Sequence, residues 1–437
     1  MEIQENQNKF LNLVFENWKN GEPTPNCPET AGNNSFNLPG GFFDFYERYY
    51  SQHLNYERNS IPVKNWKLED VKNNKDKNFY FCIKTPEPLK HLIEDKKLEL
   101  SYGVKNHLVN CNNFYFMFIR EHESETEEDL VSLKTFIKER NLPESKFIVL
   151  TNNDNFKNIV DKCNIEYHIH KLNLLQITST SVFSEMISEF NTNKKGKFFI
   201  CFNKSPKKHR YSIIAALDAY GILEDTNWSF IGKFPETHYD DTKRFFNDDD
   251  LKKINFNKFK NLELKESDFE IGKNHFNSDL SVNYEGFPEI NNGGAASGGL
   301  MLPEFDYIYR ESYCNIVTET LFEDVWNSIH ITEKTFRPFY FYLFPIFVAT
   351  HNHVKVLREK FGFDLFDDMV DHSYDNEPNQ IKRLKMIINE IIRISKNKDK
   401  FIEFYKNNQD RFEKNKQILK QLSYDDTDFF YFKSLLS

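Results

Sequence analysis

Short apolar runs alternate with segments of helical period along most of this 437-residue chain. In its first half the clearest helical segment is Glu127–Glu139, which has acidic residues in its first turn and one apolar face. Runs of aromatic and β-branched residues predict strands around it, at 79–83, 114–119, 146–150 and 165–172. Strands that alternate with helices predict an α/β domain with a mainly parallel sheet. The first ~70 residues show no clean period, so we expect them to form an irregular lead-in.

The same alternation returns after a helix expected at 182–190 and a polar segment, 191–196, which we take as the boundary between two domains. Strands are expected at 197–202, from 230 onward, at 313–320 and at 344–349. Helices are expected before Gly221 and at 353–361, 380–395 and 400–422. The domains then cover 1–195 and 196–437, with the last helices able to pack back on the first domain. We expect two α/β domains with a cleft between them, and ligands at the carboxyl ends of their strands.

The most informative segment for function is 313–350, which predicts a strand, a loop, a helix and a second strand. Thr332 is a favourable N-cap, and Glu333 follows in the first turn, where the helix dipole favours an anion. Lys334 then lies at a helix N-terminus, where backbone N–H groups and a cation can together hold a phosphate group. Pro338 falls in the second turn, where it costs less than deeper in a helix. The alternative is an ordinary strand–helix–strand crossover without a ligand.

A second candidate anion site is the basic loop that follows strand 197–202. Its sequence, NKSPKKHR, runs from Asn203 to Arg210 and leads directly into a helix. Backbone amides at that helix start, together with Arg210, would bind an anionic ligand. The alternative is a solvated basic loop, since runs of charge are often only exposed. The presence of Lys334 at another helix start in the same domain favours the anion site.

Composition and charge narrow the range of partners. The net charge is −9, which disfavours a nucleic-acid partner because such binding relies on a basic surface. Six cysteines are scattered without a CxxC pair, which is typical of buried thiols in a reducing compartment and not of a disulfide framework or zinc site. The N-terminus lacks the layout of a signal peptide, and no apolar run reaches the ~20 residues that a membrane span needs. We therefore expect a soluble, cytoplasmic protein.

The order of these motifs resembles the α-1,3-fucosyltransferase family and its virus- and phage-borne relatives. The likeness covers 197–375 and is strongest at 313–340, where NIVTET is followed by ITEKTFRP. By that resemblance the fold is the glycosyltransferase arrangement called GT-B, in which two Rossmann-like domains face a cleft. The resemblance also implies that the C-terminal domain binds a nucleotide-sugar donor.

The resemblance implies roles for individual residues of that domain. Arg210 and Lys334 would contact the diphosphate, and Glu333 the ribose or the sugar. Glu319 would line the sugar pocket. The remaining members of the substrate-binding set come from the same motifs: Asn203, Thr332 and Arg337. In the fucosyltransferases an Asn usually follows the strand-end Glu, whereas Thr320 does so here, which bears on the sugar and not on the diphosphate site.

Glycosyl transfer releases a nucleoside diphosphate, whose developing charge must be neutralised. Lysine, arginine and helix dipoles would supply that positive charge here, so we expect no metal and no cofactor besides the nucleotide-sugar co-substrate. The run Asp248-Asp249-Asp250 could be mistaken for a metal-binding motif. It is better interpreted as the acidic first turn of a helix.

An inverting transfer also needs a general base near the acceptor hydroxyl. Strand 114–119 is followed by Arg-Glu-His-Glu, so Glu121 and Glu123 are the leading candidates. The alternative is that both only decorate a loop before an acidic helix start. A rival site is the strand that places Glu166, His168 and His170 on one face.

The sequence thus favours a metal-independent, inverting glycosyltransferase that moves a sugar from a nucleotide-diphosphate donor to a glycan acceptor. GDP-fucose is the donor that the resemblance suggests. Two alternatives stay open: a glycosyltransferase that acts on modified DNA, and a catalytically silent nucleotide- or carbohydrate-binding module.

Overall fold

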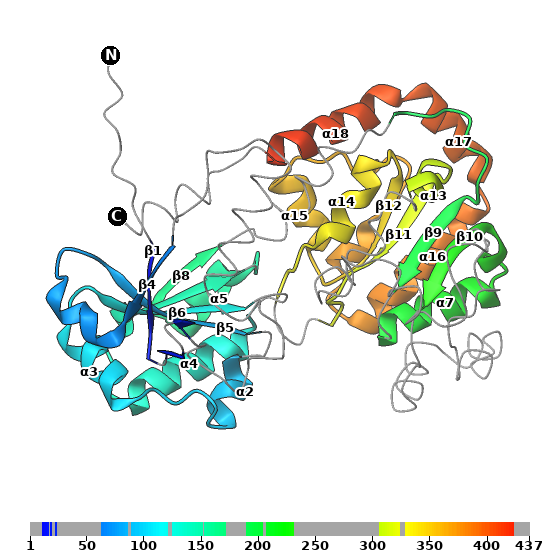
Figure 1. Cartoon of the computed structure of the whole chain (residues 1–437). Helices are drawn as coiled ribbons and strands as arrows, with labels where there is room; N and C mark the ends of the chain where they lie inside the picture. Colours follow the sequence, from blue (N-terminus) through cyan, green and yellow to red (C-terminus); the bar gives the residue numbers. More distant parts are fainter. Residues whose placement is uncertain are drawn as a thin grey trace, which may run out of the picture. The chain divides into compact units, whose positions relative to one another are not determined.

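The computed structural model describes residues 11–16, 18–19, 22–23, 63–85, 89–120, 125–151, 153–171, 189–203, 207–230, 306–323 and 328–423 (Figure 1). These residues divide into two compact units. Described residues up to Lys171 belong to the first unit and those from Glu189 onward to the second, with Ser328 assigned to the first. Each unit is an α/β structure with its own parallel sheet, which confirms the α/β class predicted for the chain.

The polar segment 191–196, expected as the boundary, packs within the second unit. Lys194 is buried, and its amine donates hydrogen bonds to the carbonyls of Ser312 (2.6 Å) and Tyr342 (3.3 Å). The N–H of Gly196 donates to the carbonyl of Glu311 at 3.0 Å. These contacts tie the segment to the second unit at Lys194 and Gly196. The helix expected at 182–190 lies outside the described residues, apart from its last two positions.

The first unit contains a six-stranded sheet in the order β4-β1-β5-β6-β7-β8, in which each pair of neighbours is parallel. The strands are β1 (Leu11–Phe15), β4 (Val63–Lys67), β5 (Phe79–Thr85), β6 (Phe114–Arg120), β7 (Phe147–Thr151) and β8 (His168–Lys171). A separate antiparallel pair joins β2 (Trp18–Lys19) to β3 (Glu22–Pro23). The four strands expected between 79 and 172 are therefore confirmed.

The expectation of an irregular lead-in was wrong at two places, because β1 and β4 belong to this sheet. Asn12 interrupts the apolar run of β1, yet its side chain is only 7% exposed. Its amide donates to the carbonyl of Asn78 at 3.1 Å, and its oxygen accepts from the indole N–H of Trp66 at 2.8 Å. These two tertiary hydrogen bonds satisfy a polar residue at a core position.

Helices and 3-10 turns join the strands of the first unit, and they are η3 (Leu68–Asn73), α2 (Leu89–Glu94), α3 (Tyr102–Asn110), α4 (Glu127–Glu139), η4 (Glu144–Lys146) and α5 (Phe156–Cys163). Helix α4 begins where the acidic first turn predicts it. Thr126 caps it, in a reciprocal capping box with Asp129. The face of α4 that the periodicity predicts is buried against the sheet.

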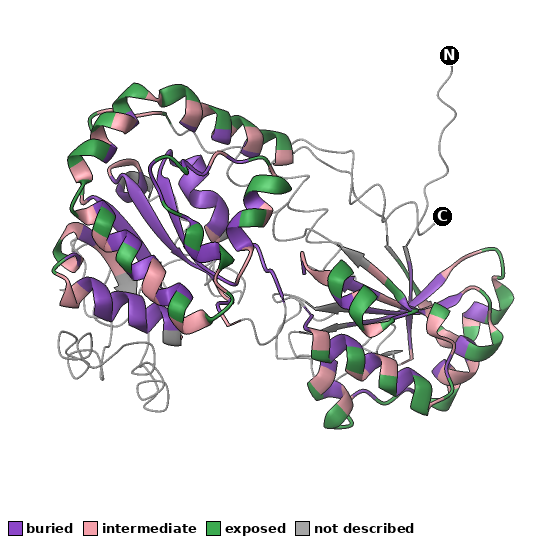
Figure 2. Ribbon diagram, turned by 180° about the vertical axis from the view of Figure 1, so that it is seen from behind, coloured by how far each residue is buried: buried purple, intermediate pink, exposed green. Residues whose placement is uncertain are grey.

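The second unit contains a four-stranded parallel sheet in the order β10-β9-β11-β12. The strands are β9 (Phe199–Asn203), β10 (Thr226–Phe230), β11 (Cys314–Thr318) and β12 (Phe344–Val348). Every residue of β9, β11 and β12 is buried, as expected for a parallel sheet covered on both faces (Figure 2). A strand was expected to start at 230–232, whereas β10 already begins at Thr226, with two polar residues that hide it from a search for apolar runs, and the chain after Phe230 lies outside the described residues.

Helices of the second unit are α7 (Lys208–Ala219), α13 (Asp306–Arg310), α14 (Glu333–Tyr340), α15 (His353–Glu359), α16 (Gln380–Ser395), α17 (Lys398–Asn407) and α18 (Gln409–Ser423), with 3-10 turns η5 (Leu223–Asp225) and η10 (Ser373–Asn376). Helix α16 packs against β12 and α7, while α14 packs against β11, β12 and α18. The single helix expected at 400–422 is two helices, because the helical conformation is interrupted at Asn408. None of the described helices is long and apolar enough to cross a membrane.

The strand order fixes where a ligand crevice can form in this sheet. From β9 the chain passes to β10 on one side, whereas β11 and β12 lie on the other side. The carboxyl ends of β9 and β11 therefore flank a topological switch point, which is the usual ligand position in open α/β sheets. The segments singled out from the sequence follow these two strands.

Candidate functional site

The site begins with a hydrogen bond that joins the carboxyl ends of β9 and β11. Asn203 is the last residue of β9 and Thr318 the last of β11, and both are buried. The hydroxyl of Thr318 donates to the side-chain oxygen of Asn203 at 2.6 Å. This bond holds the two strand ends together at the switch point.

Side chains of the basic segment after β9 form hydrogen bonds with the backbone at the end of β11 and just after it. Lys207 donates to the carbonyl of Thr320 at 2.9 Å, and Nε2 of His209 lies 2.9 Å from the carbonyl of Glu319. Arg210 donates to the carbonyls of Thr318 (3.4 Å) and Glu319 (3.3 Å). Three side chains of a run that could have been only a solvated loop are thus bound to backbone carbonyls at and after the end of β11.

Electrostatics and burial define the state of His209. Burial, with the neighbouring charge of Arg210 as the next cause, holds the pKa of His209 well below its usual range. The imidazole is therefore neutral at physiological pH. Because Nε2 faces a carbonyl oxygen, that nitrogen carries the proton.

Phe322 also holds the loop after β11 in place. The imidazole of His209 stacks on its ring, with centroids 5.2 Å apart and planes at 24°. The guanidinium of Arg383, from α16, lies 4.8 Å from the ring centroid and donates to the carbonyl of Phe322 at 2.7 Å. Arg383 also donates to the carbonyl of Glu377 at 2.8 Å, so it ties the loop after β11 to the start of α16.

Glu319, which the resemblance assigns to a sugar pocket, lies in a shell of protein hydrogen-bond donors. Its side chain is 0% exposed, and its carboxylate accepts hydrogen bonds from the hydroxyls of Thr332 (2.9 and 2.8 Å) and Thr335 (2.5 Å). Backbone N–H groups of Thr320 (3.1 Å) and Thr332 (3.4 Å) complete the shell. A carboxylate satisfied by this many protein donors organises the start of α14, and the place of Glu319 in a sugar pocket stays a prediction.

The start of α14 confirms the predicted N-cap. The hydroxyl of Thr332 accepts from the N–H of Lys334 at 3.3 Å and from its side-chain amine at 3.2 Å. Lys334 is half-buried, in contrast to Arg210, which is 4% exposed. Glu333 is the first residue of α14, and its side chain lies outside the described part of the chain.

A third strand end joins the network through His353, the first residue of α15 after β12. Its Nε2 lies 3.1 Å from the hydroxyl of Thr335. That hydroxyl donates its hydrogen to Glu319, so Nε2 of His353 must be the donor in this contact. Neither Thr335 nor His353 was expected at the site. Thr335 carries a readable signal, because it lies one turn from Thr332 on the same helix face.

The structure separates other candidates from this cluster or does not describe them. Arg337 is buried and donates to the hydroxyl of Tyr309 at 3.1 Å, so its guanidinium faces α13. In the first unit, Glu166 and His168 are exposed, and the side chain of His170 lies outside the described residues. Glu121, Glu123 and the run Asp248 to Asp250 also lie outside the described residues. Among the residues that are described, no group of three His, Cys, Asp or Glu side chains could hold a metal ion.

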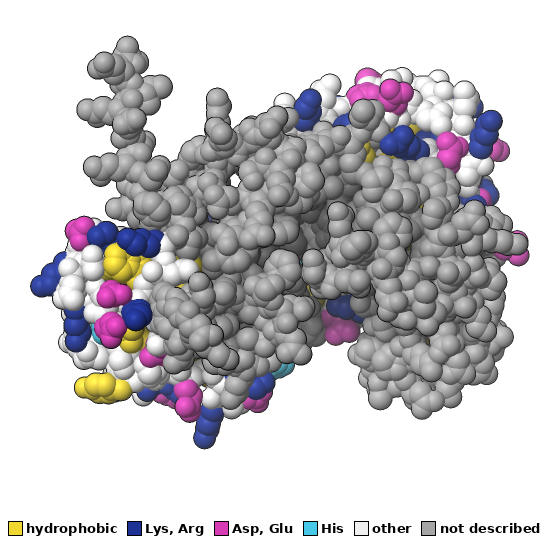
Figure 3. Space-filling view, in the orientation of Figure 1, with side chains coloured by type: hydrophobic (Ala, Val, Ile, Leu, Met, Phe, Trp, Pro, Cys, Tyr) yellow, Lys and Arg dark blue, Asp and Glu magenta, His cyan; other side chains and the backbone are white. Residues whose placement is uncertain are grey.

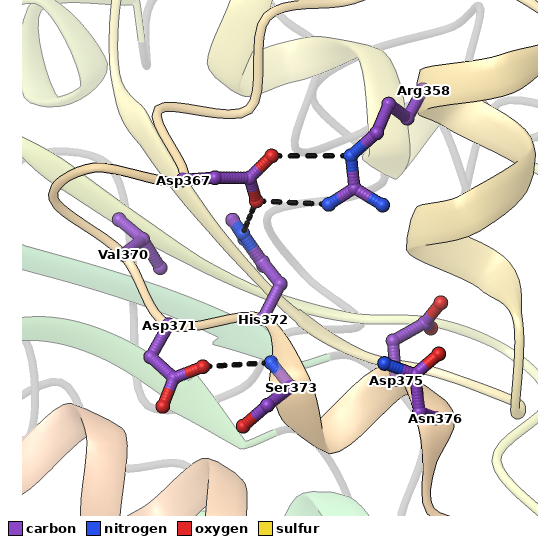
Figure 4. A pocket seen from close by; sticks show the side chains of 8 residues that line it. All are labelled: Arg358, Asp367, Val370, Asp371, His372, Ser373, Asp375 and Asn376. Atoms are coloured by element: carbon purple, nitrogen blue, oxygen red, sulfur yellow. Dashed lines mark hydrogen bonds and ion pairs between the residues drawn. The ribbon is translucent and has the colours of Figure 1, made fainter.

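A cavity of about 230 Å³ lies elsewhere in the second unit, between α15 and η10 (Figure 4). Arg358 forms a two-pronged ion pair with Asp367 (2.8 and 3.1 Å), and His372 lies 3.0 Å from the same carboxylate. The hydrogen bond from His372, and after it the one from Arg358, lower the pKa of Asp367 to about 2, although burial acts in the opposite direction. Two further carboxylates of the lining accept from backbone N–H groups: Asp371 from Ser373 at 2.9 Å, and Asp375 from Val354 and Lys355 at 3.0 and 2.9 Å.

Comparison with protein-family models, with curated proteins and with solved structures finds no match for this chain. The class of protein therefore follows from the fold itself: an α/β protein with two parallel sheets. Its second unit has a polar cluster at the switch point of its sheet, built from the ends of β9, β11 and β12.

Proposed function

We propose that this chain is a glycosyltransferase of the GT-B type, which transfers a sugar from a nucleotide-diphosphate donor to a glycan acceptor. The observation that carries the proposal is Lys334 at the capped N-terminus of α14, beside the switch point of the second sheet. A helix N-terminus with a lysine in this position suits a diphosphate. GDP-fucose remains the donor suggested by the resemblance to the α-1,3-fucosyltransferases.

The burial of the candidate cations divides their roles. Lys334 is half-buried and can reach a ligand, so we assign it the direct contact with the diphosphate. Arg210 donates to two backbone carbonyls, so it would hold the loop after β11 and add positive potential. Fixed cations and a helix N-terminus can stabilise a leaving diphosphate as its charge develops, with little reorganisation.

The test is the affinity for GDP, UDP and CDP, measured by calorimetry on the full chain. Lys334→Ala should weaken binding of the preferred nucleotide by on the order of 1.5–3 kcal/mol, which is about 10- to 150-fold. Lys406→Ala is the matched control, because Lys406 is exposed in the last turn of α17. Absence of binding for every nucleotide, or equal affinity in the two variants, would remove the support for the proposal.

Two alternatives make different predictions. A catalytically silent binding module would bind a nucleotide but neither hydrolyse nor transfer the sugar of any donor. A DNA-modifying enzyme would bind DNA with an affinity that falls steeply with salt. Over the described surface of the first unit visible in Figure 3, Lys and Arg are interspersed with Asp and Glu, without a basic stripe for DNA.

A further inference from the structure

We infer that Glu319 and Thr332 are positioning residues that fix the amine of Lys334 at the N-terminus of α14. The contacts of these three residues carry the inference, and only the identity of the ligand, a nucleoside diphosphate, rests on the proposed function. Glu319 would then act through Thr332 without touching the ligand.

The direction of each hydrogen bond follows from what each group can donate. An ionised carboxylate only accepts, so the single hydroxyl hydrogen of Thr332 points to Glu319. The lone pairs of that hydroxyl are left to accept, and they face the N–H and the amine of Lys334 at 3.3 and 3.2 Å. Glu319 therefore sets the orientation of the hydroxyl that holds Lys334.

Burial makes this arrangement rigid. Glu319 and Thr332 are 0% and 2% exposed, so water does not compete for their hydrogen bonds. The backbone of Glu319 is held as well, by the N–H that donates to the carbonyl of Val348 at 3.0 Å and by the hydrogen bond from His209 to its carbonyl. An ammonium has three hydrogens, so a bond to Thr332 is compatible with contacts to phosphate oxygens.

Thr335 offers a matched comparison within the same network. Its hydroxyl also donates to Glu319, but it accepts from His353 and so belongs to the arm that leads to α15. Loss of the Thr335 hydroxyl removes a buried hydrogen bond to the same carboxylate. A purely structural role of the network would therefore make Thr332 and Thr335 equivalent for Lys334.

The experiment measures the reactivity of the Lys334 amine directly, by limited acetylation of the full chain and mass spectrometry, with Lys406 as internal reference. Thr332→Val should raise acetylation of Lys334 by about threefold or more, because the amine loses the hydroxyl that accepts its hydrogen bond. Thr332→Ser, which keeps the hydroxyl, and Thr335→Val should stay within about twofold of the wild type. If Thr332→Val does not fold, Thr332→Gly replaces it, because glycine is a residue that N-cap positions accept.

Equal acetylation of Lys334 in the Thr332→Val and Thr335→Val variants, or no change in either, would overturn the inference. A second measurement adds GDP or UDP, which should protect Lys334 in the wild type. If neither nucleotide protects Lys334 but Thr332→Val still raises its acetylation, the result contradicts the proposed function alone. Where a nucleotide binds, Thr332→Val should lower the affinity for it about tenfold in an otherwise wild-type chain. The same change should have no such effect in a Lys334→Ala background, because the effects of coupled residues are not additive.

Discussion

Arg383 offers the sharpest test of how the site is held, because one buried side chain secures the loop after β11. It is 1% exposed and donates to the carbonyls of Phe322 at 2.7 Å and Glu377 at 2.8 Å. Arg383→Met keeps the apolar stem but leaves both carbonyls without this donor. Hydrogen bonds to charged groups contribute about 1.5–3 kcal/mol each, so we expect a loss of about 3–5 kcal/mol.

Thermal unfolding measures this loss, and for a unit of this size it corresponds to a fall in Tm of roughly 6–20 °C. Hydrogen exchange adds a local readout, since backbone amides at 319–323 should exchange faster. Lys382→Met is the matched control, because the neighbouring Lys382 is exposed on the same helix. Arg383→Lys should lose most of the stability as well, because a single amine lacks the fork that reaches both carbonyls. If Arg383→Met and Lys382→Met unfold alike, the loop is not held in this way.

Three further outcomes are expected. Ionised Asp367 stabilises the fold above its ordinary pKa of 3.8, and this contribution is lost as the pH falls toward the folded value of about 2. Asp367→Asn should therefore lower stability at pH 7, and only modestly because the carboxylate is half exposed. Near pH 2 the variant should match the wild type, as measured by acid titrations followed by circular dichroism. Glycosyl transfer should persist in excess EDTA, and loss restored by Mg²⁺ would bring Asp248 to Asp250 back as ligands. Glu123→Gln or Glu121→Gln should lower kcat by ~10²–10⁴-fold with donor affinity retained, and wild-type rates in both would place the base elsewhere.

The alternation of apolar and polar positions predicted most of the secondary structure, for identifiable reasons. Helix α16 has the bounds that its periodicity predicts, because Ile and Leu recur on one face and Asn379 caps its start. Strand β1 was not predicted because Asn12 interrupts its apolar run, and the groups that pair with Asn12 are far away in the sequence. The break between α17 and α18 was also not predicted, because the charged pattern continues across it and gives no sign of a helix end.

The site was predictable only where its residues have local signals. Thr332 and Lys334 follow from helix-capping rules, and their contacts are local in sequence. The burial of Glu319 and the anchoring of Phe322 by Arg383 depend on contacts between distant segments. Residue type alone does not distinguish a carboxylate that faces a ligand from one that organises a helix start. That distinction needed the hydrogen-bond partners.

The first unit also pairs a strand-end carboxylate with a helix cap, and this pair offers a further candidate for the general base that the proposed function needs. In the first sheet the switch point lies between β1 and β5, and Glu16 directly follows β1. Ser101 caps α3 and donates its hydroxyl hydrogen to Glu16, as Thr332 caps α14 and donates to Glu319. Glu319 is fully buried, whereas Glu16 is only half-buried, so Glu16 retains the access that proton transfer requires. A carboxylate at a switch point is better placed for an acceptor than one that follows β6, so Glu16→Gln belongs in the same kinetic comparison.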